Sequence, residues 1–186
     1  MTGTTVEGHS ERPASSSNDL NDVQLAVLKT LREQRAPLFA LLDAARDDRV
    51  LDLLQNSGEK YQSLYEGQQG EDLANFAPYL VALPQHSSFL RAILKEGWGK
   101  SWGVYLTCTS EFGDLRKHLR HFLEVTLPGG KNAYFRFYDP RVLRVYLPNC
   151  TADDTKEFFG PIAAYLAEDE DAKKCCILLA PAKKEI

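Results

Sequence analysis

Short apolar runs that alternate with helix-like segments constrain the fold of this chain more than any other feature. Runs of five or six mostly apolar residues, the length and composition of buried strands, occur at 38–43, 79–83 and 104–108. Segments before and between them carry apolar residues at helical spacing, as over 20–34 and 88–96. Because strands alternate with helices, we expect an α/β fold, with α+β as the other possibility, in which helices flank a central mixed sheet.

A hairpin is expected in the second half of the chain. Two β-rich runs, 124–127 and 132–138, flank a Gly-Gly turn, a pattern typical of two antiparallel strands. The dipeptide Asp139-Pro140 then favours the start of a helix, since proline suits the first helical position.

The last part of the chain predicts one more helix and one more strand. Thr151 and Asp154 resemble a capping box, with Asp in the position more often held by Glu. The helix that they begin is expected to end before Gly160. An apolar run over 175–180 predicts a closing strand.

Length and composition indicate one globular domain preceded by a tail. The chain has 186 residues, of which 44% are hydrophobic and 26% charged, ordinary values for a folded domain. Residues 1–18 contain almost no large apolar side chains, so we expect a disordered tail there. The α/β lobe is expected over 19–160, and 161–186 is expected to complete the domain as a short segment.

Cysteine content and the lack of a targeting signal favour a reducing, bacterial-type cytoplasm as the location of this protein. The formal net charge of −4 argues against a general nucleic-acid binder, which would carry an excess of basic residues. No secretory signal or membrane helix is evident, so we expect no membrane insertion. The four cysteines form no CxxC pair, which favours reduced thiols over a disulfide framework or a zinc site.

The motifs of common enzymes are incomplete in this sequence. His118 and His121 stand three residues apart, but a metal site would need a third ligand, and the cation Arg120 lies between them. The segment 97–101 ends in Gly-Lys-Ser without the first glycine of a phosphate loop, and there is no Gly-x-Ser-x-Gly elbow. We therefore expect no catalytic residue, no metal and no cofactor.

Arginines form the densest polar constellation. Arg116 and Arg120 lie four residues apart on a predicted helix. Arg136, Asp139 and Arg141 follow within thirty residues. Such arginines can bind phosphate or carboxylate ligands through two parallel hydrogen bonds. They can equally form ion pairs that hold the fold together, and we favour this second interpretation.

These same residues carry a resemblance to a known family. The segment LeuArgLysHisLeuArgHisPheLeu, a Gly turn and PheArgPheTyrAspProArgValLeu resemble the core pattern of the domain-of-unknown-function family numbered 4123. The segments 38–45, 61–67 and 77–83 occur in the same order in that family. The resemblance spans about residues 37–160.

The resemblance implies a type VI secretion adaptor, also called an effector chaperone. Such proteins have no known enzymatic activity; they bind a secreted effector in the bacterial cytoplasm and deliver it to its VgrG or PAAR spike protein. The family pairs an α/β lobe with a variable, mostly helical lobe that contributes to cargo choice. In this chain we expect that C-terminal lobe to be reduced.

Two hypotheses about function follow. In the first, the chain is a non-enzymatic adaptor whose partner-binding residues are Trp98, Trp102, Arg116, Arg120 and Tyr138. The residues expected to hold the structure of the family pattern are His118, Arg136, Asp139, Pro140 and Arg141. In the alternative, the Arg/His cluster serves a small anion-binding or hydrolytic domain, which would require His118, His121 and Asp139 to converge.

Overall fold

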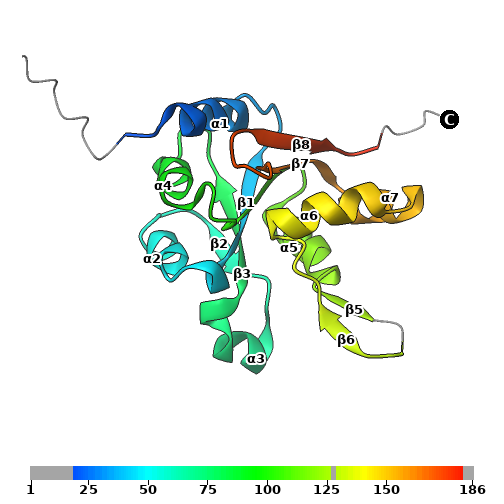
Figure 1. The fold of residues 1–186 in the computed structure, drawn as a ribbon. Helices are drawn as coiled ribbons and strands as arrows, with labels where there is room; N and C mark the ends of the chain where they lie inside the picture. The colour runs from blue at the N-terminus through cyan, green and yellow to red at the C-terminus, as the bar shows by residue number, and fades with distance from the viewer. Residues whose placement is uncertain (1–18, 127–128, 182–186) are drawn as a thin grey trace, which may run out of the picture.

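A six-stranded sheet forms the centre of the molecule, whose computed structural model describes residues 19–126 and 129–181. The strands are β1 (Leu38–Asp43), β2 (Tyr61–Ser63), β3 (Pro78–Leu83), β4 (Gly103–Cys108), β7 (Ile162–Glu168) and β8 (Cys175–Leu179). Their order across the sheet is β2-β3-β1-β4-β7-β8 (Figure 1).

Helices cover both faces of this sheet (Figure 1). One face carries α1 (Asp22–Arg32), α2 (Arg49–Gln55) and α4 (Ser88–Gly97). The other carries α5 (Phe112–His121), α6 (Pro140–Tyr146) and α7 (Ala152–Phe159). Helix α3 (Gly67–Asp72) and the hairpin of β5 (Glu124–Thr126) and β6 (Asn132–Tyr134) lie toward the same end of the molecule. Three short 3-10 segments complete the described elements: η1 (Ala44–Arg46), η2 (Ala74–Phe76) and η3 (Leu147–Asn149).

The expected fold class, a sheet flanked by helices, is confirmed, but the sheet is antiparallel where a mixed sheet was expected. Every pair of neighbouring strands in it is antiparallel. Strands β3 and β4, which α4 connects, run in the same direction, yet β1 lies between them and pairs with both. Inserting β1 between two parallel strands therefore removes the parallel pairing that a strand–helix–strand pattern predicts.

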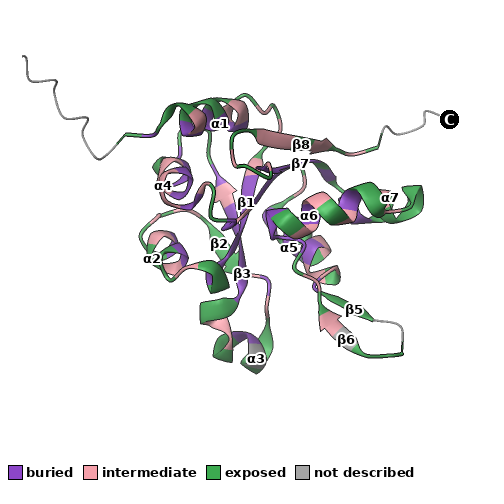
Figure 2. Cartoon of the chain, in the orientation of Figure 1, coloured by how far each residue is buried: buried purple, intermediate pink, exposed green. Residues whose placement is uncertain are grey.

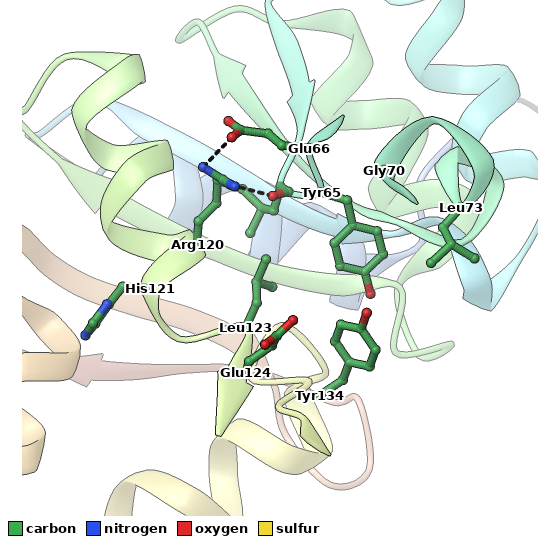
Figure 3. Close-up of a pocket in the computed structure, with 10 residues that line it drawn as sticks. Tyr65, Glu66, Gly70, Leu73, Arg120, His121, Leu123, Glu124 and Tyr134 are labelled. Carbon is green, nitrogen blue, oxygen red and sulfur yellow. Dashed lines mark hydrogen bonds and ion pairs between the residues drawn. The ribbon is translucent and has the colours of Figure 1, made fainter. Parts of the chain in front are cut away.

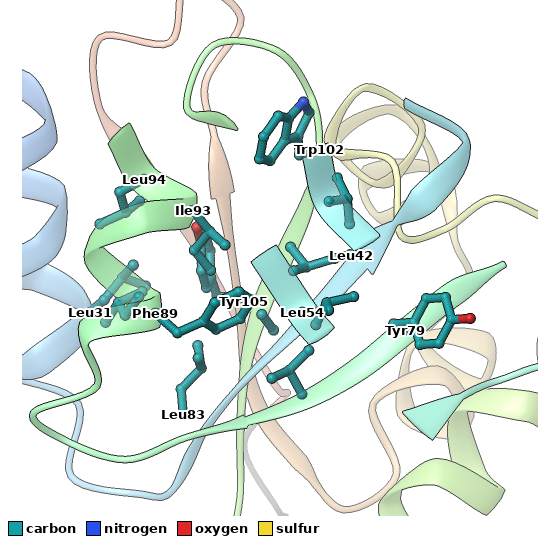
Figure 4. Packing of buried hydrophobic residues seen from close by; sticks show 14 of the residues in the cluster. Leu31, Leu42, Leu54, Tyr79, Leu83, Phe89, Ile93, Leu94, Trp102 and Tyr105 are labelled. Atoms are coloured by element: carbon teal, nitrogen blue, oxygen red, sulfur yellow. The ribbon is translucent and has the colours of Figure 1, made fainter. Parts of the chain in front are cut away.

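Alternation of side chains along the strands fills two separate hydrophobic cores. In β1, Ala40 and Leu42 face α1, α2 and α4, whereas Phe39 and Leu41 face α5, α6 and α7. Figure 2 shows that residues of the central strands are buried, and Figure 4 shows the first core, which includes the Trp102 indole and aliphatic side chains. The sheet therefore packs on both sides, which accounts for the almost continuous apolar sequence of its strands.

Aromatic rings dominate the second core. The fully buried Phe158 ring of α7 lies 5.2 Å, centre to centre, from the rings of Phe122 and Tyr165. It lies 5.5 Å from Phe137 and 5.3 Å from Tyr146. Edge-to-face and stacked pairs of this kind add to the stabilisation from area burial alone. Phe158 thus joins α7, α6, β7 and the segment after β6.

Most element positions agree with the sequence predictions. The first predicted helix is α1, the three apolar runs are β1, β3 and β4, and the closing strand is β8. The Asp139 side chain accepts a hydrogen bond from the N–H of Arg141 at the start of α6, with Pro140 in the first turn. The capping box of Thr151 and Asp154 is present at the start of α7.

The strands differ from the sequence predictions in two places. Strand β7, which directly follows Gly160 and Pro161 and is rich in alanine, was not predicted. The second strand of the hairpin ends at Tyr134 instead of 138, because the chain then turns inward to bury Phe137. Both β7 and β8 lie within 161–186 and extend the main sheet, whereas the predicted tail over 1–18 lies outside the described residues.

None of the helices in the described part of the chain is long and apolar enough to cross a membrane.

The thiol of Cys175, which is partly buried, has a raised pKa that can be measured. All four cysteines are free thiols, and burial raises the pKa of Cys175 to about 12. At pH 8 its reactive thiolate is then about a thousandfold less populated than that of an ordinary cysteine. We expect iodoacetamide to alkylate Cys175 only very slowly in the folded protein, as followed by tandem mass spectrometry. Equal alkylation rates at Cys175 in folded and urea-unfolded protein would contradict this burial.

Candidate functional site

Two arginines of α5 hold the chain that follows the edge strand β2. The Arg116 Nε donates a hydrogen bond to the Ser63 carbonyl at 2.7 Å, and the Arg120 Nε donates to the Leu64 carbonyl at 2.8 Å. Both guanidinium groups also pair with the Glu66 carboxylate, one with each oxygen, at 2.5 and 2.7 Å. We call this set of Arg116, Arg120 and Glu66 the arginine clamp.

Arg120 and Glu66 of the clamp form one wall of a cleft between α5, α3 and the β5–β6 hairpin (Figure 3). The cleft has a volume of about 380 Å³. Its lining residues are Leu64, Tyr65, Glu66, Gly70, Leu73, Arg120, His121, Leu123, Glu124 and Tyr134. We call it the tyrosine cleft, because Figure 3 shows the rings of Tyr65 and Tyr134 directed toward each other across it.

The two tyrosines differ in how far they are buried. Their ring centres are 5.8 Å apart, and Tyr134 of the hairpin is 51% exposed. Tyr65 is half-buried, and burial raises the pKa of its hydroxyl although Tyr138 donates a hydrogen bond to it. Tyr65 is thus held in place from the core, while Tyr134 presents its ring at the surface.

Charges of both signs surround the apolar surface of the tyrosine cleft. The hydrogen bond from Arg116, together with the charges of both clamp arginines, lowers the pKa of Glu66 despite partial desolvation. Glu66 is therefore ionised at neutral pH, and Glu124 and His121 add further polar groups to the lining. Exposed tyrosine rings beside charged groups are enriched where proteins bind other proteins, although the exposed lining of this cleft is more polar than apolar.

The residues of the family pattern form separate local contacts. Asp139 is buried, and its carboxylate binds the side chain of Arg141 through two hydrogen bonds of 2.9 and 2.5 Å. Burial alone would raise the pKa of Asp139, but these bonds from Arg141 leave it below its usual range. Arg136 pairs with the buried carboxylate of Asp43 at the end of β1, instead of with Asp139. Pro140 is buried in the first turn of α6.

His118 and His121 both line a shallow hollow on α5, but Asp139 does not line it with them. The Nε2 of His118 lies 3.0 Å from the Phe158 carbonyl, and burial lowers the pKa of this imidazole. His121 is exposed and lies 3.6 Å from Glu157, whereas Asp139 is bound by Arg141. Each of the three groups thus has its own partner. In the part of the chain that the structure describes, no cluster of three or more His, Cys, Asp or Glu could hold a metal ion.

Burial corrects several of the predicted partner-binding residues. Trp102 is 4% exposed and Tyr138 is 3% exposed, so neither ring is available to a partner. The cause is local: the Trp102 indole packs so closely on Gly97 that a side chain there would collide with it. Arg116 is only 9% exposed, and its guanidinium donates to the Ser63 carbonyl and to the Glu66 carboxylate. It supports the cleft without lining it.

Hydrogen bonds hold the loop that carries Trp98. The Trp98 Nε1 donates to the Ala172 carbonyl at 2.7 Å, and the ring is half-buried. The carboxylate of Glu168 accepts hydrogen bonds from the N–H groups of Gly99 and Ser101, at 2.6 and 2.9 Å. Trp98 therefore fastens its loop to the turn between β7 and β8.

Of the predicted contacts, Arg120 alone lines the tyrosine cleft. Sequence reasoning missed Tyr65, Glu66 and Tyr134, which approach from segments about seventy residues apart. The available signal was weak: Tyr134 is an aromatic residue in a predicted hairpin strand, and Tyr65 follows a short alternating run. Their proximity depends on how the hairpin folds back against the end of β2, which no local pattern records.

Comparison with known proteins identifies one family. The family described as "Domain of unknown function (DUF4123)" matches residues 38–157, nearly two thirds of the chain. No curated protein and no solved structure matches the chain. The matched residues include the arginine clamp and the whole lining of the tyrosine cleft. The chain therefore belongs to the DUF4123 family.

Proposed function

We propose that this protein is a non-enzymatic adaptor of the bacterial cytoplasm that binds a type VI secretion effector and helps load it onto its VgrG or PAAR spike protein. The observation that carries the proposal is the tyrosine cleft, a surface hollow that presents an exposed aromatic ring among polar groups of both charges. The resemblance of the family pattern to type VI adaptors supplies the class of partner.

The cleft suggests how the partner is held. A hollow of about 380 Å³ is large enough for one or two apolar side chains of a helix or extended segment. The half-exposed Tyr134 ring would pack on such a side chain, while Arg120 and Glu124 at the rim would select its neighbours by charge. The arginine clamp keeps this wall in position, so less ordering is required when the partner binds.

Export of the effector tests the proposal in the cell. In a strain that carries Tyr134→Ala, we expect secretion of the cognate effector to fall about tenfold, the loss typical of truncating a central interface tyrosine. Secreted and intracellular effector are compared by immunoblotting. Leu25→Ala is the matched control, because Leu25 on α1 is exposed to a similar degree and does not line the cleft. Normal export with Tyr134→Ala at wild-type protein levels would count against the proposal.

A further inference from the structure

A second hollow lies at the opposite end of strand β3 from the tyrosine cleft. Leu64 of the tyrosine cleft is hydrogen-bonded to Pro78 at the start of β3, whereas Leu83 at its end lines the second hollow. This groove, of about 760 Å³, runs between the α1–β1 connection and the β3–α4 connection. We call it the arginine groove, since Arg32 and Arg35 both line it.

The two arginines of the groove lack the partners that other arginines of this chain have. Neither Arg32 nor Arg35 forms an ion pair or a side-chain hydrogen bond with any residue in 19–126 or 129–181, and the Arg32 Nε is buried without an acceptor. The neighbouring carboxylate, Glu33, lies 3.8 Å from Lys29. The groove therefore carries two arginines without ion pairs and one carboxylate, which gives it a net positive charge in a chain whose net charge is −4.

A structural role explains only part of this arrangement. Arg32 lies in the last turn of α1, where a cation interacts favourably with the helix dipole. The dipole interaction does not provide an acceptor for the Nε hydrogen of Arg32. A buried donor that makes no hydrogen bond costs free energy. A carboxylate bound side-on to the guanidinium accepts from Nε and Nη2 together, after a rotation of this half-buried side chain.

The remaining lining indicates a peptide more than a small anion. Pro37 and Pro84 are exposed on the two connections, and Leu38 is partly exposed between them. Apolar surface on both walls fits the side chains and backbone of an extended segment. Inorganic phosphate would leave that surface uncovered.

We propose that the arginine groove binds an extended acidic segment of a partner protein, with its carboxylates on Arg32 and Arg35 and its apolar side chains on Pro37 and Pro84. Charge complementarity is the basis of the assignment, because the groove offers two unpaired cations and its one acidic lining residue is paired elsewhere. The proposal stands independently of the tyrosine cleft and of the proposed function. It gives the protein two binding surfaces, one at each end of β3.

A labelled peptide of alternating Glu and Leu residues tests the groove by fluorescence anisotropy at physiological salt. We expect the full-length protein to bind this peptide, and Arg32→Gln and Arg35→Gln each to weaken binding about tenfold. Arg32→Lys should bind with intermediate affinity, since it keeps the charge and loses the two-pronged geometry. Lys156→Gln is the matched control: it removes one positive charge from an exposed position on α7, outside the groove, and should change affinity less than about twofold.

Three further results separate the proposal from its alternatives. A peptide with Gln in place of Glu should bind much more weakly; equal binding would overturn the carboxylate assignment. A single-stranded oligonucleotide that binds more tightly than the acidic peptide, and loses affinity in Arg32→Gln, would overturn the assignment to a protein segment. The melting temperature of Arg32→Gln should fall by no more than about 3 °C, the loss of the interaction with the helix dipole, because the side chain makes no hydrogen bond within the described residues. A larger fall would assign Arg32 a structural role and overturn the proposal.

Discussion

Replacing Phe158 by alanine is expected to lower the free energy of unfolding by about 3–5 kcal/mol, the range for removing a large ring from a packed core. Phe158 is fully buried, and its ring contacts Phe122, Phe137 and Tyr165, which belong to three different parts of the second core. The remaining rings cannot collapse into the space together, because each is fixed by its own backbone.

Urea unfolding followed by circular dichroism measures this loss. Phe76→Ala is the control, since Phe76 is 60% exposed and its removal should change stability by less than about 0.5 kcal/mol. A loss below about 1 kcal/mol for Phe158→Ala would contradict the packing of the second core.

Replacing Arg116 by methionine is expected to lower the free energy of unfolding by about 2–3 kcal/mol. The Arg116 guanidinium donates to the Ser63 carbonyl at 2.7 Å and pairs with Glu66. The side chain as a whole is only 9% exposed. Methionine keeps much of the apolar volume but removes every donor, so the carbonyl at the end of β2 loses its partner.

The other arginine of the clamp provides the comparison. Arg120 makes similar bonds to Leu64 and Glu66 from a more exposed position, so Arg120→Met should cost less, about 1 kcal/mol. Thermal and urea unfolding of both variants measure the difference. If Arg120→Met proved as destabilising as Arg116→Met, burial of Arg116 would not be what makes the clamp strong.

The sheet could be predicted where the sequence alone specifies burial. Runs such as 38–43 and 104–108 are apolar throughout because both faces of their strands are covered, and no helix of that length would be stable in isolation. Strand β7 was missed because its alanines give little strand preference, and it forms by pairing with β4 and β8. The order of strands depends on long-range pairing that local patterns do not contain.

The site was harder to predict than the fold, because exposure is a property of the folded chain. Tryptophan and tyrosine are common anchors at interfaces, but they are equally suited to a hydrophobic core. The rings of Trp102 and Tyr138 are both buried. Arg120 was identified from its helical spacing with Arg116, which local geometry determines. Tyr134 gains its role only when the hairpin meets the chain after β2.

The central claim is that a partner protein binds in the tyrosine cleft, and isothermal titration calorimetry tests it most directly. The purified chain is titrated with each protein encoded beside its gene, which under the proposal include a type VI effector and its spike protein. We predict a one-to-one complex with a dissociation constant of about 1 μM or tighter, weakened at least about tenfold by Tyr134→Ala and unchanged by Leu25→Ala. Absence of binding to both proteins, or equal affinity of the wild type and Tyr134→Ala, would contradict the claim.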